Sequence, residues 1–287
     1  MEMSTAAASG EVCYGGGESN INLVEALNPK VYGNGSMDLV LAHGFGADQG
    51  VWHLLLPYLT VWFRVVVFDL AFSGNVNPKL YDPTKYSSLD SYARDLLSLL
   101  DHLGVKKTVY VGHSMSAMIG CLAAAQRPQL FEHLILLCGS PRYLNEEGYN
   151  GGLERYQVDA ILNQIDQNFT SWVPTFAPKV VGVNDESAIR EFELSLRRMK
   201  PETILSVAKT VFLSDLRDVL PKVRVPNCTI IQSKMDFVVP DNVAFYMKER
   251  LGDGNATVEM LETKGHLPQL TTHLSLLEVL KKVLHLY

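Results

Sequence analysis

Short apolar runs alternate with segments of helical periodicity through much of the chain. The run Val65-Val66-Val67-Phe68 is rich in β-branched residues, which is typical of a strand covered on both faces. Apolar residues over 89–103 recur at helical spacing and stop at Gly104, as expected of an amphipathic helix. This alternation predicts an α/β protein with a mostly parallel sheet and helices on both faces. The predicted strands are 39–42, 65–68, 108–111, 134–137, 228–232 and 257–261.

The pattern changes between residues 141 and 220, where strand-like runs give way to three sets of apolar residues at helical spacing. We therefore expect a helical insertion over 141–220 that divides a core formed by 21–140 and 221–287. Residues 1–20 are rich in Ala, Ser and Gly, and have too little apolar surface to order themselves. They are predicted to be a disordered tail.

Composition narrows the functional classes. The 287 residues carry a formal net charge of −6 without a Lys/Arg cluster, which argues against nucleic-acid binding. No pair of the four cysteines has metal-ligand spacing, and no phosphate-binding or nicotinamide motif is present, so we expect no metal and no cofactor. Neither a signal peptide nor a membrane span is recognisable. A soluble protein of the cytoplasm, the nucleus or both is predicted.

Three motifs that follow predicted strands carry candidate chemistry: Gly112-His113-Ser114-Met115-Ser116, Lys234-Met235-Asp236 and Lys264-Gly265-His266. A serine hydroxyl becomes a nucleophile at neutral pH when a base removes its proton and a carboxylate orients that base. The order Ser, acid, His is that of the α/β-hydrolase fold. We therefore predict this fold, with 141–220 as a helical lid, and Ser114, Asp236 and His266 as its catalytic triad.

The nucleophile and the acid each have a second interpretation. Ser114 departs from the G-x-S-x-G pattern because Ser116 occupies the last position, and a serine before a helix also serves as an N-cap. Asp236 could simply form a turn. Asp215 and Asp218 are less suitable acids because they lie in a charged segment that is typical of a helix end.

His266 is the preferred base among eight histidines because it follows a strand and a glycine and precedes Leu-Pro. His113 adjoins the nucleophile, but neighbouring side chains are expected to diverge on a sharp turn. His43 is expected to shape its own loop. Four others are expected on helix or strand surfaces: His102, His133, His273 and His285.

An oxyanion hole requires two backbone N–H groups, one after the nucleophile and one after an early strand. Met115 supplies the first, and Phe45 in His43-Gly44-Phe45-Gly46 supplies the second. The lid segment contains several aromatic residues, which favours a small apolar cavity over the nucleophile. They are Tyr143, Trp172, Phe176, Phe192 and Phe212.

Four motifs together resemble the plant strigolactone and karrikin receptor hydrolases, the DWARF-type proteins. They are Gly-Phe-Gly-Ala-Asp-Gln at 44–49, Gly-His-Ser-Met-Ser-Ala-Met-Ile-Gly at 112–120, Ser-Pro-Arg-Tyr at 140–143 and Gly-His-Leu-Pro-Gln-Leu at 265–270. The resemblance runs from about residue 21 to the C-terminus and includes Ser116. The chain is most similar to the divergent DWARF-like branch.

This resemblance implies a four-helix lid over an apolar pocket that takes butenolide signals. It also implies slow hydrolysis, in which Ser114 and His266 can carry a covalent adduct, and a lid that engages an F-box protein and repressor proteins. The implied pocket residues are Phe45, Tyr143, Phe176, Phe192 and Phe212. Two other functions share these motifs: an ordinary small-ester carboxylesterase without a signalling role, and a non-catalytic ligand-binding protein.

Overall fold

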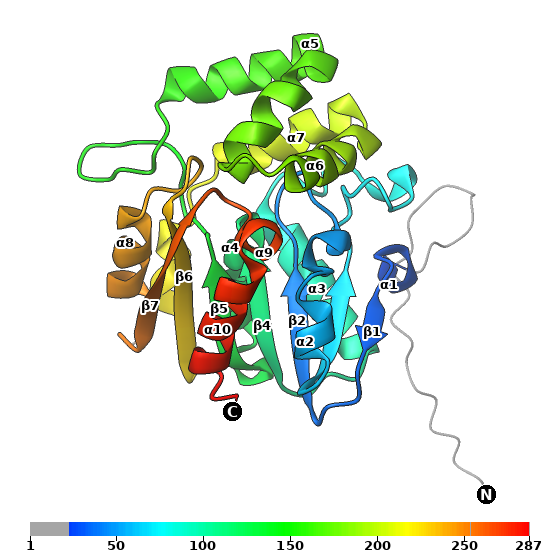
Figure 1. Ribbon diagram of the computed structural model, residues 1–287, viewed down its shortest axis with the longest axis vertical. Helices are drawn as coiled ribbons and strands as arrows, with labels where there is room; N and C mark the ends of the chain where they lie inside the picture. Colours follow the sequence, from blue (N-terminus) through cyan, green and yellow to red (C-terminus); the bar gives the residue numbers. More distant parts are fainter. Residues whose placement is uncertain (1–22, 253, 287) are drawn as a thin grey trace, which may run out of the picture.

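The computed structural model describes residues 23–252 and 254–286, and the predicted tail lies outside these ranges. The described residues form a sheet of seven strands in the order β1-β3-β2-β4-β5-β6-β7 (Figure 1). Strand β1 (Lys30–Tyr32) runs antiparallel to β3, and every other neighbouring pair is parallel. The parallel strands are β2 (Met37–Ala42), β3 (Phe63–Phe68), β4 (Thr108–His113), β5 (Phe131–Leu137), β6 (Asn227–Met235) and β7 (Ala256–Lys264).

The mostly parallel sheet is confirmed. Residues 65–68 of β3 are almost fully buried, as a continuous apolar run predicts for a strand covered on both faces. No separate signal marks β1 in the sequence, because its three residues are exposed at the sheet edge and show no alternation. Its place is determined by pairing with β3, which is a tertiary contact.

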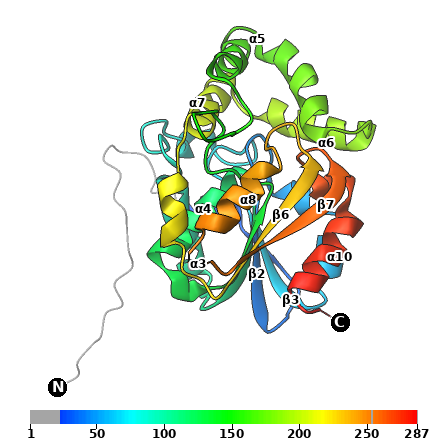
Figure 2. The ribbon, with the colours of Figure 1, turned by 90° about the vertical axis from the view of Figure 1, so that its left-hand side faces the viewer.

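Helices cover both faces of the sheet (Figure 2). One face carries α3 (Leu89–His102), α4 (Met115–Gln126) and α8 (Asn242–Arg250), and the other carries α2 (Leu56–Leu59), α9 (Pro268–Thr271) and α10 (His273–Val283). The shorter elements are α1 (Leu23–Ala26), η1 (Gln49–Trp52), η2 (Pro78–Leu80), η3 (Pro128–Leu130) and η4 (Arg217–Lys222), the last four being 3₁₀ helices. In the described part of the chain, no helix is long and apolar enough to cross a membrane.

The helical segment after β7 is divided in two. Thr272 takes a non-helical conformation, with φ −142° and ψ 41°. It therefore separates α9 from α10. Apolar periodicity continues through the break, so the periodicity alone does not reveal it.

Three helices lie between β5 and β6 and stand over the carboxyl ends of the strands (Figure 1). They are α5 (Arg155–Val181), α6 (Glu186–Arg198) and α7 (Pro201–Phe212). Asn168 interrupts α5 with φ −154° and ψ 54°, so residues 155–212 form four helical segments. This number agrees with the four-helix insertion that the family resemblance implies.

Two side chains of α6 connect this insertion to the loop that follows β2, one by a hydrogen bond and one by an ion pair. The Ser195 hydroxyl donates to the carbonyl oxygen of Gly46, and Arg198 forms an ion pair with Asp48. The Gly46 φ of 74° lies in the left-handed region. The loop that contains Phe45 is therefore held by the insertion as well as by the sheet.

A glycine–glycine junction joins the end of α5 to the loop after β7. Gly182 ends α5 with φ 73°, and a Cβ there would lie 2.5 Å from the Cα of Gly265. Gly265 has φ 88°, and a Cβ there would collide with the carbonyl oxygen of Val181. Both glycines are needed for the backbones to approach this closely. His266, the predicted base, directly follows this junction.

Gly265→Ala is expected to lower both thermal stability and turnover. The left-handed φ costs about 1–2 kcal/mol for an L-residue, and the collision with Val181 must also push the His266 loop away from α5. Melting temperature and kcat would be measured together. Gly148→Ala is the matched control, because Gly148 has φ 75° but a Cβ there would meet nothing within 4 Å, so it carries the backbone cost alone. Equal effects of the two substitutions would contradict the close packing of this junction.

Candidate active site

Ser114 lies on a sharp turn between β4 and α4, at the carboxyl edge of the sheet. Its φ of 57° and ψ of −121° are rare for a residue with a side chain, and such conformations cost about 1–3 kcal/mol. Gly112 permits the turn, since a Cβ there would collide with the carbonyl oxygen of Ser116. Ser114 makes no side-chain hydrogen bond to the start of α4, which argues against the N-cap interpretation. The geometry is that of a nucleophile elbow.

Ser116 has a structural role that the sequence did not reveal. Its hydroxyl donates to the carbonyl oxygen of His43 over 2.5 Å, and its own carbonyl oxygen accepts from the Tyr110 hydroxyl over 2.9 Å. The first bond ties the elbow to the loop after β2. A glycine at this position, as in the general motif, would lack that hydroxyl.

The structure brings together the three predicted triad residues, which lie up to 152 positions apart in the sequence. Nε2 of His266 lies 2.8 Å from the Ser114 hydroxyl oxygen, and Nδ1 lies 2.6 Å from a carboxylate oxygen of Asp236. The side chains of His266 and Asp236 are 5% and 0% exposed. These contacts are the two hydrogen bonds that a triad requires.

Asp236 uses its two carboxylate oxygens for different purposes. Oδ1 accepts from the backbone N–H groups of Val238, over 2.8 Å, and Val239, over 3.2 Å. Oδ2 accepts from His266, with the Gln232 amide 3.4 Å away. The turn-forming and triad interpretations of Asp236 therefore both describe the structure. The turn fixes the carboxylate so that one oxygen faces the imidazole.

Two backbone N–H groups are available for an oxyanion. Within residues 23–252 and 254–286, neither the N–H of Phe45 nor that of Met115 has a hydrogen-bond acceptor. His43 holds the Phe45 loop, as expected: Nδ1 donates to the Gly44 carbonyl oxygen over 2.9 Å, and Nε2 accepts from the Leu70 N–H over 2.9 Å. Burial lowers the pKa of His43, so the ring keeps this neutral form.

A small apolar cavity lies over Ser114 and His266. The aromatic residues expected to line it all do so: Phe45, Tyr143, Phe176, Phe192 and Phe212. Trp172 instead stacks on Phe176 from behind, with ring centroids 4.5 Å apart. Three aliphatic residues complete the lining, and the sequence offered no signal for them: Val180, Val211 and Val238.

The hydroxyl of Tyr143 is a polar group in this apolar lining. It is buried and has no hydrogen-bond partner among the described residues. Burial raises the pKa of Tyr143, and the nearby Ser114 side chain partly offsets that shift. Because Tyr143 lines the cavity, a bound ligand with an acceptor could use this unpaired neutral hydroxyl.

Two expectations about the other histidines are wrong. His113 does not diverge from the site: its Nε2 lies 2.7 Å from the carbonyl oxygen of His266, and the two ring centroids are 4.9 Å apart. His133 is not on the surface, because it is buried in β5 and its Nε2 lies 2.8 Å from the Thr229 hydroxyl. Burial lowers the pKa of His133 to about 4. In both cases a partner distant in sequence sets the position of the ring.

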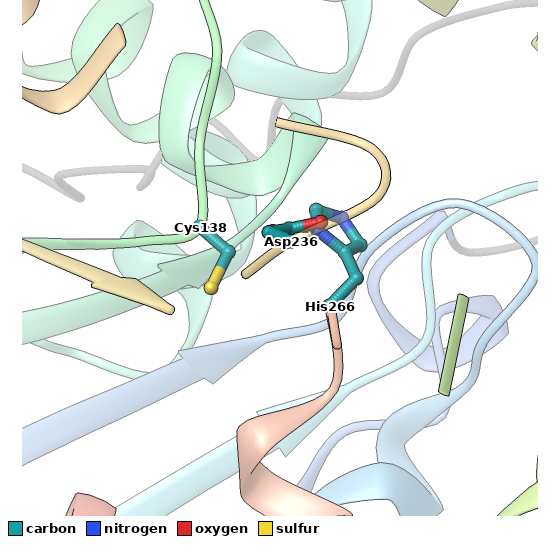
Figure 3. Close-up of side chains that lie close together, drawn as sticks. All are labelled: Cys138, Asp236 and His266. Atoms are coloured by element: carbon teal, nitrogen blue, oxygen red, sulfur yellow. Dashed lines mark hydrogen bonds and ion pairs between the residues drawn. The ribbon is translucent and has the colours of Figure 1, made fainter. Parts of the chain in front are cut away.

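Cys138 approaches the triad from the end of β5 (Figure 3). Its sulfur, a carboxylate oxygen of Asp236 and a ring nitrogen of His266 lie within 4.8 Å of one another, which makes them the only such group of candidate metal ligands in the described part of the chain. However, the 2.6 Å contact between His266 and Asp236 is the length of a strong N–H···O bond. Burial raises the pKa of the Cys138 thiol, so the thiolate that would bind a metal is disfavoured. The geometry therefore fits a triad better than a metal centre.

Comparisons with known proteins agree with this geometry. Residues 39–272 match the family model described as the alpha/beta hydrolase fold. The chain is 48% identical to strigolactone esterase D14 of Arabidopsis thaliana over 93% of this chain and 99% of the relative. It is 44% identical to karrikin insensitive 2 receptor CA of Petunia hybrida over 91% of this chain and 96% of the relative.

The solved structure of a hydrolase from Oleispira antarctica is also similar, with a TM-score of 0.88 and 30% identity over 93% of this chain and 97% of the other. Fold, site geometry and sequence similarity thus point the same way. The chain belongs to the α/β-hydrolase fold family, and within it to the group that contains the strigolactone esterases and the karrikin receptors.

Proposed function

We propose that this chain is a receptor-like serine hydrolase that binds a small butenolide-containing signal and cleaves it slowly. One observation carries the proposal: Ser114 and His266, joined by a hydrogen bond, form part of the wall of an apolar cavity. Relatives named as a strigolactone esterase and as a karrikin receptor share nearly the whole chain. Their names supply the ligand class, which is strigolactone-like or karrikin-like.

The proposed reaction begins when the Ser114 oxygen attacks the ligand's ester or enol-ether-linked carbon and His266 Nε2 takes the serine proton. Asp236 holds Nδ1–H and stabilises the imidazolium that forms. The N–H groups of Phe45 and Met115 bind the developing oxyanion. His266 then protonates the leaving oxygen, and a water molecule releases the product bound to Ser114. By family resemblance, the adduct can also reside on His266.

We assign the insertion of residues 141–220 the role of a lid, because α5, α6 and α7 supply five residues of the cavity lining: Phe176, Val180, Phe192, Val211 and Phe212. A lid that closes over bound ligand would also slow product release, in keeping with low turnover. By resemblance to the receptors, the partners are an F-box protein and repressor proteins. Action in the cytoplasm or the nucleus follows from those partners.

A single-turnover experiment tests the proposal. The protein is mixed with a butenolide enol-ether, and intact mass and kcat are followed. We expect a covalent adduct on Ser114 or His266 and a kcat far below the 1–10³ s⁻¹ that is typical of enzymes, about one turnover or fewer per minute. A melting temperature that changes on ligand addition would accompany it.

Three other results would overturn the proposal in different ways. Many cycles per second on simple acyl esters, without an adduct from the butenolide, would indicate an ordinary carboxylesterase. A thermal shift without any hydrolysis would indicate a non-catalytic binding protein. The absence of both a thermal shift and an adduct would rule out butenolides as the ligand class.

Tyr143→Phe is expected to have opposite effects on the free and the liganded protein. It removes a buried hydroxyl that lacks a partner, so the free protein should be more stable by up to about 1 kcal/mol. A ligand that accepts a hydrogen bond from Tyr143 should bind about 3- to 10-fold more weakly. Melting temperature and titration calorimetry measure the two effects. Tyr156→Phe is the control, because Tyr156 is 71% exposed. Unchanged affinity for every ligand tested would show that the hydroxyl has no binding role.

A further inference from the structure

Both polar groups of the His266 backbone are held by partners distant in sequence. The N–H of His266 donates to the carbonyl oxygen of Val180, in α5, over 2.8 Å. The carbonyl oxygen of His266 lies 2.7 Å from Nε2 of His113. The chain just before it is also held, since the Gly265 N–H donates to the Met235 carbonyl oxygen over 2.8 Å. This peptide therefore has its position set by three separate elements of the fold.

The identity of the acceptor determines the tautomer of His113. A carbonyl oxygen only accepts hydrogen bonds, so the proton must be on Nε2 and Nε2 must donate. Nδ1 faces Gly44 and is buried without a hydrogen-bond partner among the described residues. Burial, together with the proximity of His266, holds the pKa of His113 well below its usual range. His113 is thus a neutral donor with a single strong bond, and that bond goes to the predicted base.

We propose that His113 is a positioning residue for the hydrolysis, and that its Nε2–H bond to the His266 carbonyl fixes the imidazole of His266 between Ser114 and Asp236. The proposal rests on the proposed function, because it assigns a role within the same reaction. It goes beyond the triad by giving the residue before the nucleophile a task of its own. The sequence-based expectation that this side chain points away from the site is replaced by a direct contact.

The expected loss of kcat without the His113 bond follows from the geometry of the two triad hydrogen bonds. The two triad bonds are 2.8 Å and 2.6 Å long, so a shift of the His266 peptide by a fraction of an ångström would weaken both. Misplacement of a catalytic group by about 1 Å can cost on the order of 10²-fold in rate. Loss of the His113 bond should therefore lower kcat by about 10- to 100-fold. The cavity wall does not include His113, so KM should change little.

Two conservative substitutions of His113 separate the role of its Nε2–H donor from the packing role of its ring. In His113→Gln, the side-chain amide nitrogen falls near the place of Nε2 and keeps a donor toward His266. In His113→Asn, the amide nitrogen falls near the place of Nδ1 and cannot reach the carbonyl. We expect the Gln variant to retain a kcat within about 3-fold of the wild type, and the Asn variant to lose about 10- to 100-fold, with similar KM values. Should the Asn variant not fold, His113→Leu takes its place with the same expectation.

A second readout does not depend on turnover. The proton on His266 Nδ1, in its 2.6 Å hydrogen bond to Asp236, is expected to give a low-field resonance in a proton NMR spectrum. This resonance should be kept in His113→Gln and lost or shifted in His113→Asn. If the wild type hydrolyses no ester, the proposed function fails while the NMR comparison still tests the positioning.

Two results would overturn the proposal. Wild-type kcat and an unchanged resonance in His113→Asn would show that the bond positions nothing. Equal losses in His113→Asn and His113→Gln, with equal falls in melting temperature, would show a packing role for the ring instead of a role for the donor.

Discussion

Ser114→Ala is expected to reduce the turnover of a butenolide ester or a simple acyl ester by about 10⁴–10⁶-fold. The substitution removes the only atom that His266 activates through its 2.8 Å hydrogen bond, and it leaves the cavity walls in place. Hydrolysis would be followed by product release in single-turnover and steady-state assays. Binding should remain, because eight of the ten residues that line the cavity are apolar or aromatic and keep their contacts with the ligand.

The control for this substitution is Ser87→Ala, on the protein surface before α3, which should leave turnover unchanged. Thermal shift with ligand in the Ser114→Ala variant separates binding from cleavage. Turnover within 10-fold of the wild type would contradict the assignment of the nucleophile. Lost binding together with lost turnover would instead indicate that the elbow itself had collapsed.

Asp236→Asn is expected to reduce kcat by about 10⁴-fold with little change in KM. The amide oxygen can replace Oδ1 as the acceptor for Val238 and Val239, so the turn should be retained. The amide NH₂ group then faces Nδ1 of His266 where a carboxylate accepted before. Two donors cannot share this contact, so His266 must adopt the other tautomer and can no longer accept the serine proton.

Steady-state kinetics of Asp236→Asn beside Asp218→Asn would test this role. Asp218 is an exposed acid that the sequence offered as an alternative, and its substitution should change kcat by less than 2-fold. A small effect of Asp236→Asn, or a large one of Asp218→Asn, would contradict the assignment of the acid. An unchanged melting temperature in Asp236→Asn would show that the loss is chemical.

Much of this site could be predicted because its residues lie directly after strands. The carboxyl ends of parallel strands meet at one edge of a sheet, so Phe45, Ser114, Asp236 and His266 had to lie near one another once the strands were recognised. The residue types of the three triad members and their order Ser, Asp, His along the chain then indicated their predicted roles. The aromatic wall was implied by the family resemblance: four of its residues lie in the insertion of residues 141–220, and Phe45 follows β2.

The features that were missed depend on contacts between segments that carry no local signal. The sequence around His113 shows a turn, but only the folded chain shows that its ring returns to the carbonyl group of His266. Ser116 was recognised as an exception to the motif, and its bond to His43 gives the reason. The tie between Val180 and His266 joins the insertion to the predicted base through backbone atoms, which no side-chain pattern encodes.

Identification of the residue that reacts with a serine-directed phosphonate tests the central claim most directly. Peptide mapping by mass spectrometry of the wild type, of His266→Ala and of Asp236→Asn would locate and quantify the label. The account predicts a label on Ser114 in the wild type, with labelling at least 10²-fold slower in both variants. A label elsewhere, or equal labelling of Ser114 in all three proteins, would contradict the claim that Ser114, His266 and Asp236 act as one unit.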